Sequence, residues 1–221
     1  MSSILCPTLQ SKRRGWRLAA LLVLMLAVQI AAAGCATPTK YTVEINGYTG
    51  RGANALRPAT RIAVVPNTYS ANPLLAAEVK AKIERLLQSR GFSPSSVDSA
   101  DLVLLNVFGI GTPQEIATGA VALPLGNMIA YVPTSTISYF RWLMIGVAPA
   151  AQYGVAGLEF KDVDWSWVAE VTSSGSSGDL RTVIDYMLVA AFESFGYSTG
   201  RRVQVTLPRN DPRVRVLYGG Q

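Results

Sequence analysis

The sequence of 221 residues contains no histidine and only two cysteines, and charged residues make up 15% of it. Without histidine, the chain cannot build a His-based catalytic triad, a histidine metal site or an imidazole acid–base pair. Two cysteines cannot form a four-thiolate zinc site or a disulfide-rich scaffold. We therefore expect no catalytic residue, no cofactor and no metal ligand, and interpret the protein as a non-enzyme.

Positive charge is in excess, with 20 Lys and Arg against 14 Asp and Glu, and part of that excess is N-terminal. Four basic residues between positions 12 and 17 precede the run 18–33, which is uncharged and apolar except for one glutamine. The run ends in small residues, Ala32-Ala33-Gly34, before Cys35. A basic segment, an apolar segment and a small-residue cleavage site are typical of a secretory signal. The apolar run is slightly short for a membrane span, which needs about 20 residues.

The ending Ala32-Ala33-Gly34-Cys35 resembles the lipobox of bacterial lipoproteins, although Ala32 stands where typical lipoboxes have leucine. The resemblance implies cleavage between Gly34 and Cys35. It also implies a diacylglycerol thioether on the sulfur of Cys35, with a further acyl chain such as palmitate on its amino group, and such multiple acylation gives stable anchoring. The alternatives are an uncleaved anchor helix and a plain secretory signal with a free Cys35.

The residue after the cysteine also bears on location. In lipoproteins of this kind an aspartate at that position commonly retains the protein in the inner membrane, and here the residue is Ala36. The resemblance therefore favours the periplasmic face of the outer membrane, with the inner membrane or the periplasm as alternatives.

Removal of residues 1–34 would leave 16 basic and 14 acidic side chains, a net charge of +2. A nearly balanced domain offers little attraction to the phosphate backbone of nucleic acid. We therefore expect no nucleic-acid partner.

The remaining chain is predicted to be one α/β domain over residues 41–208, after a lipidated tether 35–40 and before a loose tail 209–221. Apolar alternation or continuous apolar runs predict strands, and apolar stripes at helical spacing predict two amphipathic helices packed on one face of a mixed sheet. The expected strands are 41–46, 62–66, 101–107, 162–171 and 203–207, and the expected helices are 73–90 and 180–195, each ended by glycine, Gly91 or Gly196.

The segment 112–157 does not resolve into clear elements. Its only charged side chains are Glu115 and Arg141, and four prolines exclude a long helix. We expect strands near 126–132 and 139–147. If its surface is exposed, the aromatic side chains Tyr131, Tyr139, Phe140 and Trp142 form a candidate interaction surface. If it is sheet interior, the same residues are simply core.

This layout resembles a family of small outer-membrane lipoproteins of unknown function. The resemblance lies in the lipobox, in Ile62–Pro66, in Pro73 with Gly91-Phe92, in Ala100–Val103, and in 164–169 followed by a helix ending near Gly196. It implies an envelope location and a non-catalytic accessory role, and it transfers no catalytic residue. The strand Ile62–Pro66 is also similar to periplasmic lipoproteins that activate cell-wall synthases or join secretion assemblies.

Three functions remain open. The leading hypothesis is a membrane-anchored binding or assembly module that contacts an envelope protein. The second is a periplasmic protein that binds or hydrolyses glycans through Trp165, Trp167, Asp162 and Asp164, because indoles two residues apart on a strand can form one platform. The third is a self-assembling subunit that uses residues 112–157.

Overall fold

The computed structural model describes residues 40–66, 70–125, 128–154 and 163–219. Residues Lys40–Gln221 form one compact unit. The predicted signal, its cleavage site at Gly34 and the lipidation site at Cys35 lie outside the described residues, as does Asp162. Their assignments stay predictions.

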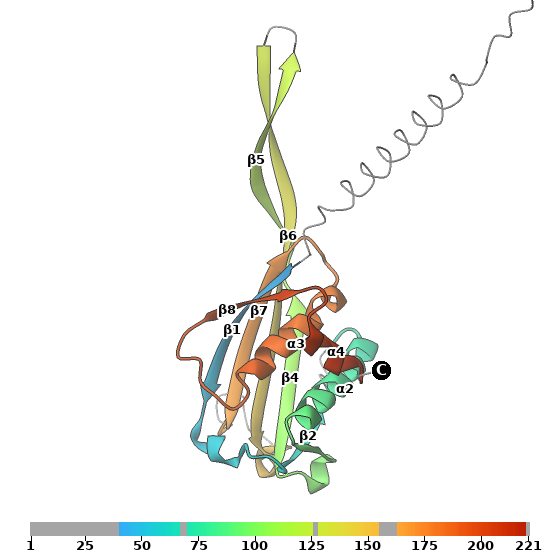
Figure 1. Cartoon of the computed structure of the whole chain (residues 1–221), viewed down its shortest axis with the longest axis vertical. Coiled ribbons are helices and arrows are strands. Elements are labelled where there is room, and N and C mark those ends of the chain that lie inside the picture. Colours follow the sequence, from blue (N-terminus) through green and yellow to red (C-terminus); the bar gives the residue numbers. More distant parts are fainter. Residues whose placement is uncertain (1–39, 67–69, 126–127, 155–162, 220–221) are drawn as a thin grey trace, which may run out of the picture. The chain divides into compact units, whose positions relative to one another are not determined.

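A single mixed sheet forms the body of this unit, as the sequence predicts (Figure 1). Its strand order is β3-β2-β4-β6-β7-β1-β8, and β5 pairs only with β6. The strands β3, β2 and β4 are parallel to one another, and every other pair is antiparallel. The strands are β1 (Lys40–Thr49), β2 (Arg61–Val65), β3 (Ser93–Pro94), β4 (Leu102–Ile110), β5 (Gln114–Leu125), β6 (Met128–Pro149), β7 (Trp167–Gly175) and β8 (Val203–Pro208).

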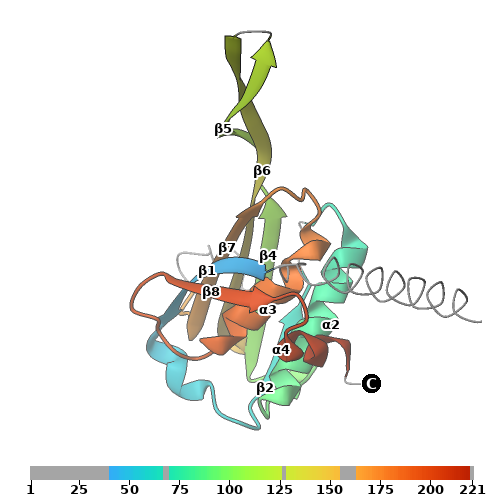
Figure 2. The ribbon, with the colours of Figure 1, turned by 45° about the horizontal axis from the view of Figure 1, so that its top comes forward.

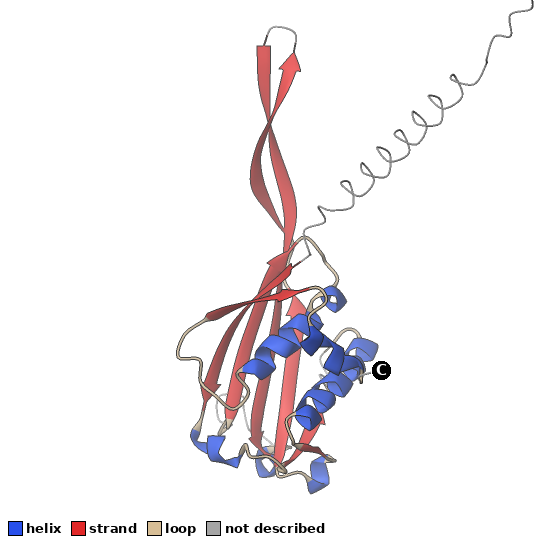
Figure 3. Ribbon diagram, viewed as in Figure 1, coloured by secondary structure: helices blue, strands red, loops and turns tan. Residues whose placement is uncertain are grey.

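The two predicted helices pack on one face of the sheet (Figure 3). Helix α2 (Pro73–Ser89) begins as expected, because the side chain of Asn72 accepts a hydrogen bond from the Leu75 N–H and Pro73 needs no partner for its missing N–H. It ends before Gly91, whose φ of 82° is readily adopted by glycine. Helix α3 (Ile184–Glu193) follows a short 3-10 turn and ends before Gly196, at φ 81°. The 3-10 turns are η2 (Arg51–Ala55), η3 (Val97–Ser99), η4 (Ala150–Gln152), η6 (Leu180–Thr182) and η7 (Val216–Tyr218).

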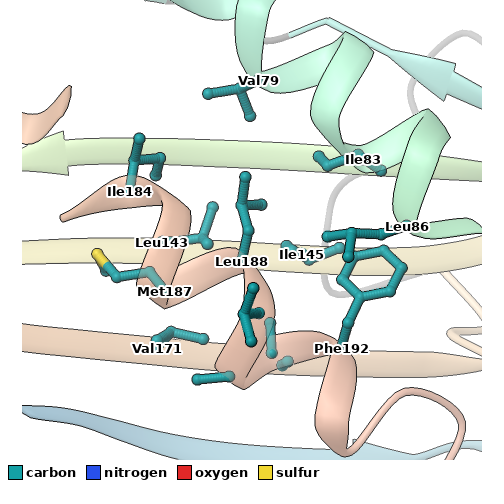
Figure 4. Packing of buried hydrophobic residues seen from close by; sticks show 14 of the residues in the cluster. Val79, Ile83, Leu86, Leu143, Ile145, Val171, Ile184, Met187, Leu188 and Phe192 are labelled. Atoms are coloured by element: carbon teal, nitrogen blue, oxygen red, sulfur yellow. The ribbon is translucent and has the colours of Figure 1, made fainter. Parts of the chain in front are cut away.

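The main core lies between these helices and the sheet (Figure 4). Val79, Ile83 and Leu86 of α2 and Ile184, Leu188 and Phe192 of α3 face the strand residues Leu143, Ile145 and Val171, which are at most 1% exposed. Burial of each such side chain contributes about 1.5–3 kcal/mol, so this layer is the main source of stability.

A buried ion pair also joins the two helices. Lys82 of α2 and Asp185 of α3 are 3% and 4% exposed, and Glu78 and the hydroxyl of Tyr218 complete the cluster around them. Burial by itself lowers the pKa of Lys82, but hydrogen bonds to Asp185 and Glu78 outweigh it, so the pKa lies above its ordinary value. Sequence reasoning did not find this cluster, because Lys82 and Asp185, the pair at its centre, are 103 residues apart on two different helices.

The other face of the sheet carries a smaller apolar cluster. It consists of Ala63, Val103 and Ala148, against which Val163 and Trp165 pack. This placement corrects the prediction that 162–171 is one strand with Trp165 and Trp167 on the same face. The strand β7 begins only at Trp167, which is fully buried in the main core, and Trp165 lies against Gly146 on the opposite face.

The C-terminal segment is ordered rather than extended or loose. It forms the short helix α4 (Pro212–Arg215) and then η7, and Leu217 is fully buried against the main core. Asp211 caps α4 by accepting a hydrogen bond from the Arg213 N–H. The sequence did not predict this packing, because the segment is too short for the burial of Leu217 to show as a helical pattern of apolar residues.

Candidate interaction surface

A long β-hairpin projects from one end of the sheet (Figures 1 and 2). It consists of β5 and the first half of β6, residues 114–138, which we call the arm. Its strands pair from Gln114 with Ser138 to Leu125 with Met128. From Tyr139 onward β6 pairs with β7 and becomes a central strand of the body. One continuous strand, β6, therefore belongs to both the core and the arm. The sequence had predicted two short strands instead, near 126–132 and 139–147.

The arm has two halves of different polarity. Directly paired residues in an antiparallel hairpin share a face, so Val121 with Val132 and Leu123 with Ala130 form one face, and Ala122 with Tyr131 and Pro124 with Ile129 form the other. All described side chains between 120 and 133, the tip half, are aliphatic, aromatic or proline. The base half, 114–119 and 134–138, contains most of the polar groups: Gln114, Glu115, Thr118, Thr134, Ser135, Thr136 and Ser138.

Both faces of the arm are exposed. The most exposed large apolar side chains lie next to the turn: Met128 at 73%, Tyr131 at 72% and Ile129 at 64%. Glu115 is the single charged residue between 112 and 140, and it lies in the base half, where Ser135 donates a hydrogen bond to it. Exposed apolar surface of this kind is typical of contact sites, so the arm is a candidate interaction surface. The described residues between 112 and 140 therefore form exposed surface and not the interior of the sheet.

The four predicted aromatic residues do not form one patch. Tyr131 lies in the tip half, and Tyr139 lies at the base, where a Cβ on Gly178 would come within 3.1 Å of its ring. Phe140 and Trp142, 46% and 37% exposed, alternate along β6 with the buried Arg141 and so lie on the sheet face opposite the helices. The sequence signal missed most of the surface, because the aliphatic residues of β5 were not recognised as a strand.

A buried arginine marks the point where the arm joins the body. Arg141 is 4% exposed, and its side chain approaches the hydroxyl of Ser173 at 3.5 Å. Burial lowers its pKa from the ordinary value, although the nearby Tyr41 acts in the opposite direction. A Cβ on Gly175, which pairs with Tyr139, would come within 2.6 Å of the guanidinium. The glycine therefore makes the space that lets this charged group enter the sheet interior.

The glycan-binding constellation does not assemble. Trp167 is fully buried and donates its indole N–H to the Tyr197 carbonyl, whereas Trp165 packs on the opposite sheet face. Asp164 is exposed. Within the described ranges, no group of three or more Cys, Asp or Glu side chains is arranged to hold a metal ion.

A second surface feature is a cavity of about 510 Å³ beside the end of α2. Arg57 and Arg90 contribute charge, and Phe92, Phe195 and Tyr197 contribute aromatic surface. Partial burial lowers the pKa of Arg90, with opposing effects from Glu193 and Tyr197. The aromatic side chains Phe92 and Phe195 also belong to the core, so this cavity is chiefly the margin of the main packing layer.

Among the helices that the structure describes, none is long and apolar enough to cross a membrane. No model of a protein family and no curated protein sequence matches this chain.

The chain is similar in structure to several solved proteins. A PDZ domain protein from Parabacteroides distasonis has 14% identity and a TM-score of 0.44, and the match covers 83% of this chain but only 42% of that one. A PelC dodecamer from Paraburkholderia phytofirmans has 11% identity and a TM-score of 0.40, with 71% and 98% covered. A DUF4136 family protein from Bacteroides thetaiotaomicron has 12% identity and a TM-score of 0.35, with 67% and 91% covered. At this level of similarity the comparisons assign no function.

Proposed function

We propose that this protein is a lipid-anchored, non-catalytic module of the bacterial envelope that acts by binding through its arm. The observation that carries the proposal is the arm itself: an apolar hairpin, exposed on both faces, that is built on a rigid sheet. Burial of an aliphatic side chain contributes about 1.5–3 kcal/mol of free energy. The exposed side chains of the arm would gain this free energy only when a partner covers them.

The anchor in this proposal is Cys35. The basic segment, the apolar run and the small residues before Cys35 support export and lipidation. The absence of aspartate at position 36 supports the periplasmic face of the outer membrane as the location.

Metabolic labelling with a palmitate analogue tests the anchor. The wild-type protein should incorporate the label and fractionate with the outer membrane, and Cys35→Ala should lose both properties. Cys6→Ala is the matched control, because Cys6 lies in the segment that the proposal removes. Equal labelling of wild type and Cys35→Ala would exclude this lipidation.

A second function, a self-assembling envelope subunit, is favoured by the same exposed arm. Long apolar strands with open edges can contact further copies of the chain. Sedimentation of the acylated protein in detergent tests this function: a discrete oligomer that becomes a monomer when the arm is shortened would support it. A monomer at high concentration would exclude it.

A further inference from the structure

We propose that the tip half of the arm enters the surface of the lipid bilayer to which the chain is anchored. This inference rests on the proposed acylation of Cys35. It assigns residues 120–133 a lipid partner, and it treats the body as a support that holds this hairpin against the membrane.

The arm and the start of the domain lie at the same end of the sheet. Glu44 pairs with Thr172, and Thr172 pairs with Trp142. Strand β1 runs parallel to β6 because both are antiparallel to β7, so Lys40, four residues before Glu44, lies near the level of Ser138. Figure 1 shows the start of β1 beside the base of the arm. Lys40, the first described residue after Cys35, therefore lies where the arm begins.

The lengths of the two segments decide how close the arm comes to the membrane. Five residues separate Cys35 from Lys40, which allows about 17 Å at full extension. From Ser138, at the level of Lys40, to Met128 the arm spans ten residues, or about 33 Å. With the tether fully extended along the direction of the arm, the arm would therefore pass the attachment point by about 16 Å, which is the length of about five residues in each strand.

The polarity of the arm changes one residue pair beyond this position. Five residues from the turn along each strand reach Val121 and Val132, and the next pair is Ala120 with Pro133. Beyond this pair, toward the body, Thr118 donates a hydrogen bond to Thr134 at 3.1 Å, and Glu115 introduces the charge. The section that would pass the attachment point is therefore the apolar section, and the hydroxyl-bearing section stays in water.

The open edges of the hairpin limit the depth of entry. Unpaired backbone groups are costly in hydrocarbon. Pro124 and Pro133 have no N–H, so they fit the ladder only where the nitrogen faces the outer edge. They remove one outward donor from each strand of the tip half. The neighbouring outward N–H groups still need water or lipid phosphate oxygens, which favours a tilted arm whose tip lies in the headgroup region and the first part of the acyl layer.

Lipid fits this surface better than a second copy does. Two arms stacked face to face would cover one face of each and leave the other exposed, whereas lipid surrounds both faces at once. The prolines also interrupt the edges that a strand from another copy would need.

Fluorescence from two matched positions tests the proposal. Ile129→Cys places a probe in the tip half, and Ile137→Cys places one in the base half, on the same face of the same strand and with similar exposure of 64% and 53%. Each full-length protein is acylated in cells, so that Cys35 carries no free thiol, and is labelled with a neutral environment-sensitive fluorophore. It is then reconstituted into vesicles of phosphatidylethanolamine and phosphatidylglycerol.

The tip probe should show a blue shift and lose emission to quenchers attached to the acyl chains, and the base probe should show neither change. If the protein is vesicle-bound and acylated but both probes behave as in water, the lipid contact is excluded while the anchor stands. If the protein is not acylated and does not bind vesicles, the proposed lipid anchor at Cys35 is wrong, and this inference fails with it. Shielding of the tip probe in detergent that rises with protein concentration would assign the arm to a second copy.

Discussion

The Nζ atom of Lys82 lies 2.6 Å from Oδ1 of Asp185, and both side chains are almost fully buried between α2 and α3. The ring of Tyr218 lies beside this pair, with its centroid 4.9 Å from Nζ. Its hydroxyl donates a hydrogen bond to Asp185. The pair therefore connects the two helices and the C-terminal segment, which are far apart in the sequence.

Removal of one partner of this pair should destabilise the protein strongly. Lys82→Met leaves a carboxylate buried without its main partner, and such changes cost about 3–5 kcal/mol. The double variant Lys82→Met with Asp185→Leu removes both charges and should recover much of this loss. Urea unfolding of the wild type, Lys82→Met, Asp185→Leu and the double variant measures the four free energies of unfolding. Additive losses in the double variant would show that the two charges are not coupled.

The free energy of unfolding should decrease at acid pH in part because Asp211, which caps α4, becomes protonated. Hydrogen bonds from the side chain of Arg213 lower the pKa of Asp211 below its ordinary value of 3.8. A carboxyl group whose folded-state pKa is lowered stabilises the protein above its unfolded-state pKa, and this contribution is lost as pH falls through the folded-state pKa. Asp211→Asn keeps a capping side chain but loses the charge that pairs with Arg213, so it should cost about 0.2–1 kcal/mol at neutral pH. The difference from wild type should shrink as the pH falls below 3.8.

Asp101 provides the control for this measurement. Arg61 also lowers its pKa by hydrogen bonding, but the two side chains are about half exposed. An exposed pair contributes little because water and salt screen it. Asp101→Asn should therefore change the unfolding free energy little at any pH. A larger acid effect for Asp101→Asn than for Asp211→Asn would contradict this explanation.

A methyl group at Gly146 should displace the ring of Trp165, which packs on the sheet face opposite the helices. A Cβ at this position would come within 2.3 Å of the Trp165 ring, which is closer than real contacts allow. Overpacking of this kind costs about 1–3 kcal/mol. Gly146→Ala should lower the unfolding temperature and shift the tryptophan emission to longer wavelength. Gly111→Ala is the control for the methyl group alone, because a Cβ there would meet its nearest neighbours at 3.6 Å, an ordinary contact.

The sequence predicted the body of the protein better than the arm. The helix bounded by Asn72 and Gly91 and the buried strand at 62–66 follow from local signals, namely a cap, a stop and a continuous apolar run. The arm has no such signal, because both of its faces are apolar and neither strand shows the alternation of a half-buried sheet. Trp165 lies before the start of β7, so the alternation of that strand does not determine which sheet face it covers.

Shortening the arm should leave the body folded. In the arm, β5 pairs only with β6, and its side chains are exposed, so the main core loses no contact. The variant replaces residues 117–135 with an Asn-Gly turn between Ile116 and Thr136, which face each other in the hairpin. The unfolding free energy should change by less than about 1 kcal/mol, as for other surface changes. Aggregation measured by light scattering should fall, because the exposed apolar surface is removed. Loss of cooperative unfolding in this variant would mean that the arm supports the body, and the arm could then no longer be treated as an independent contact element.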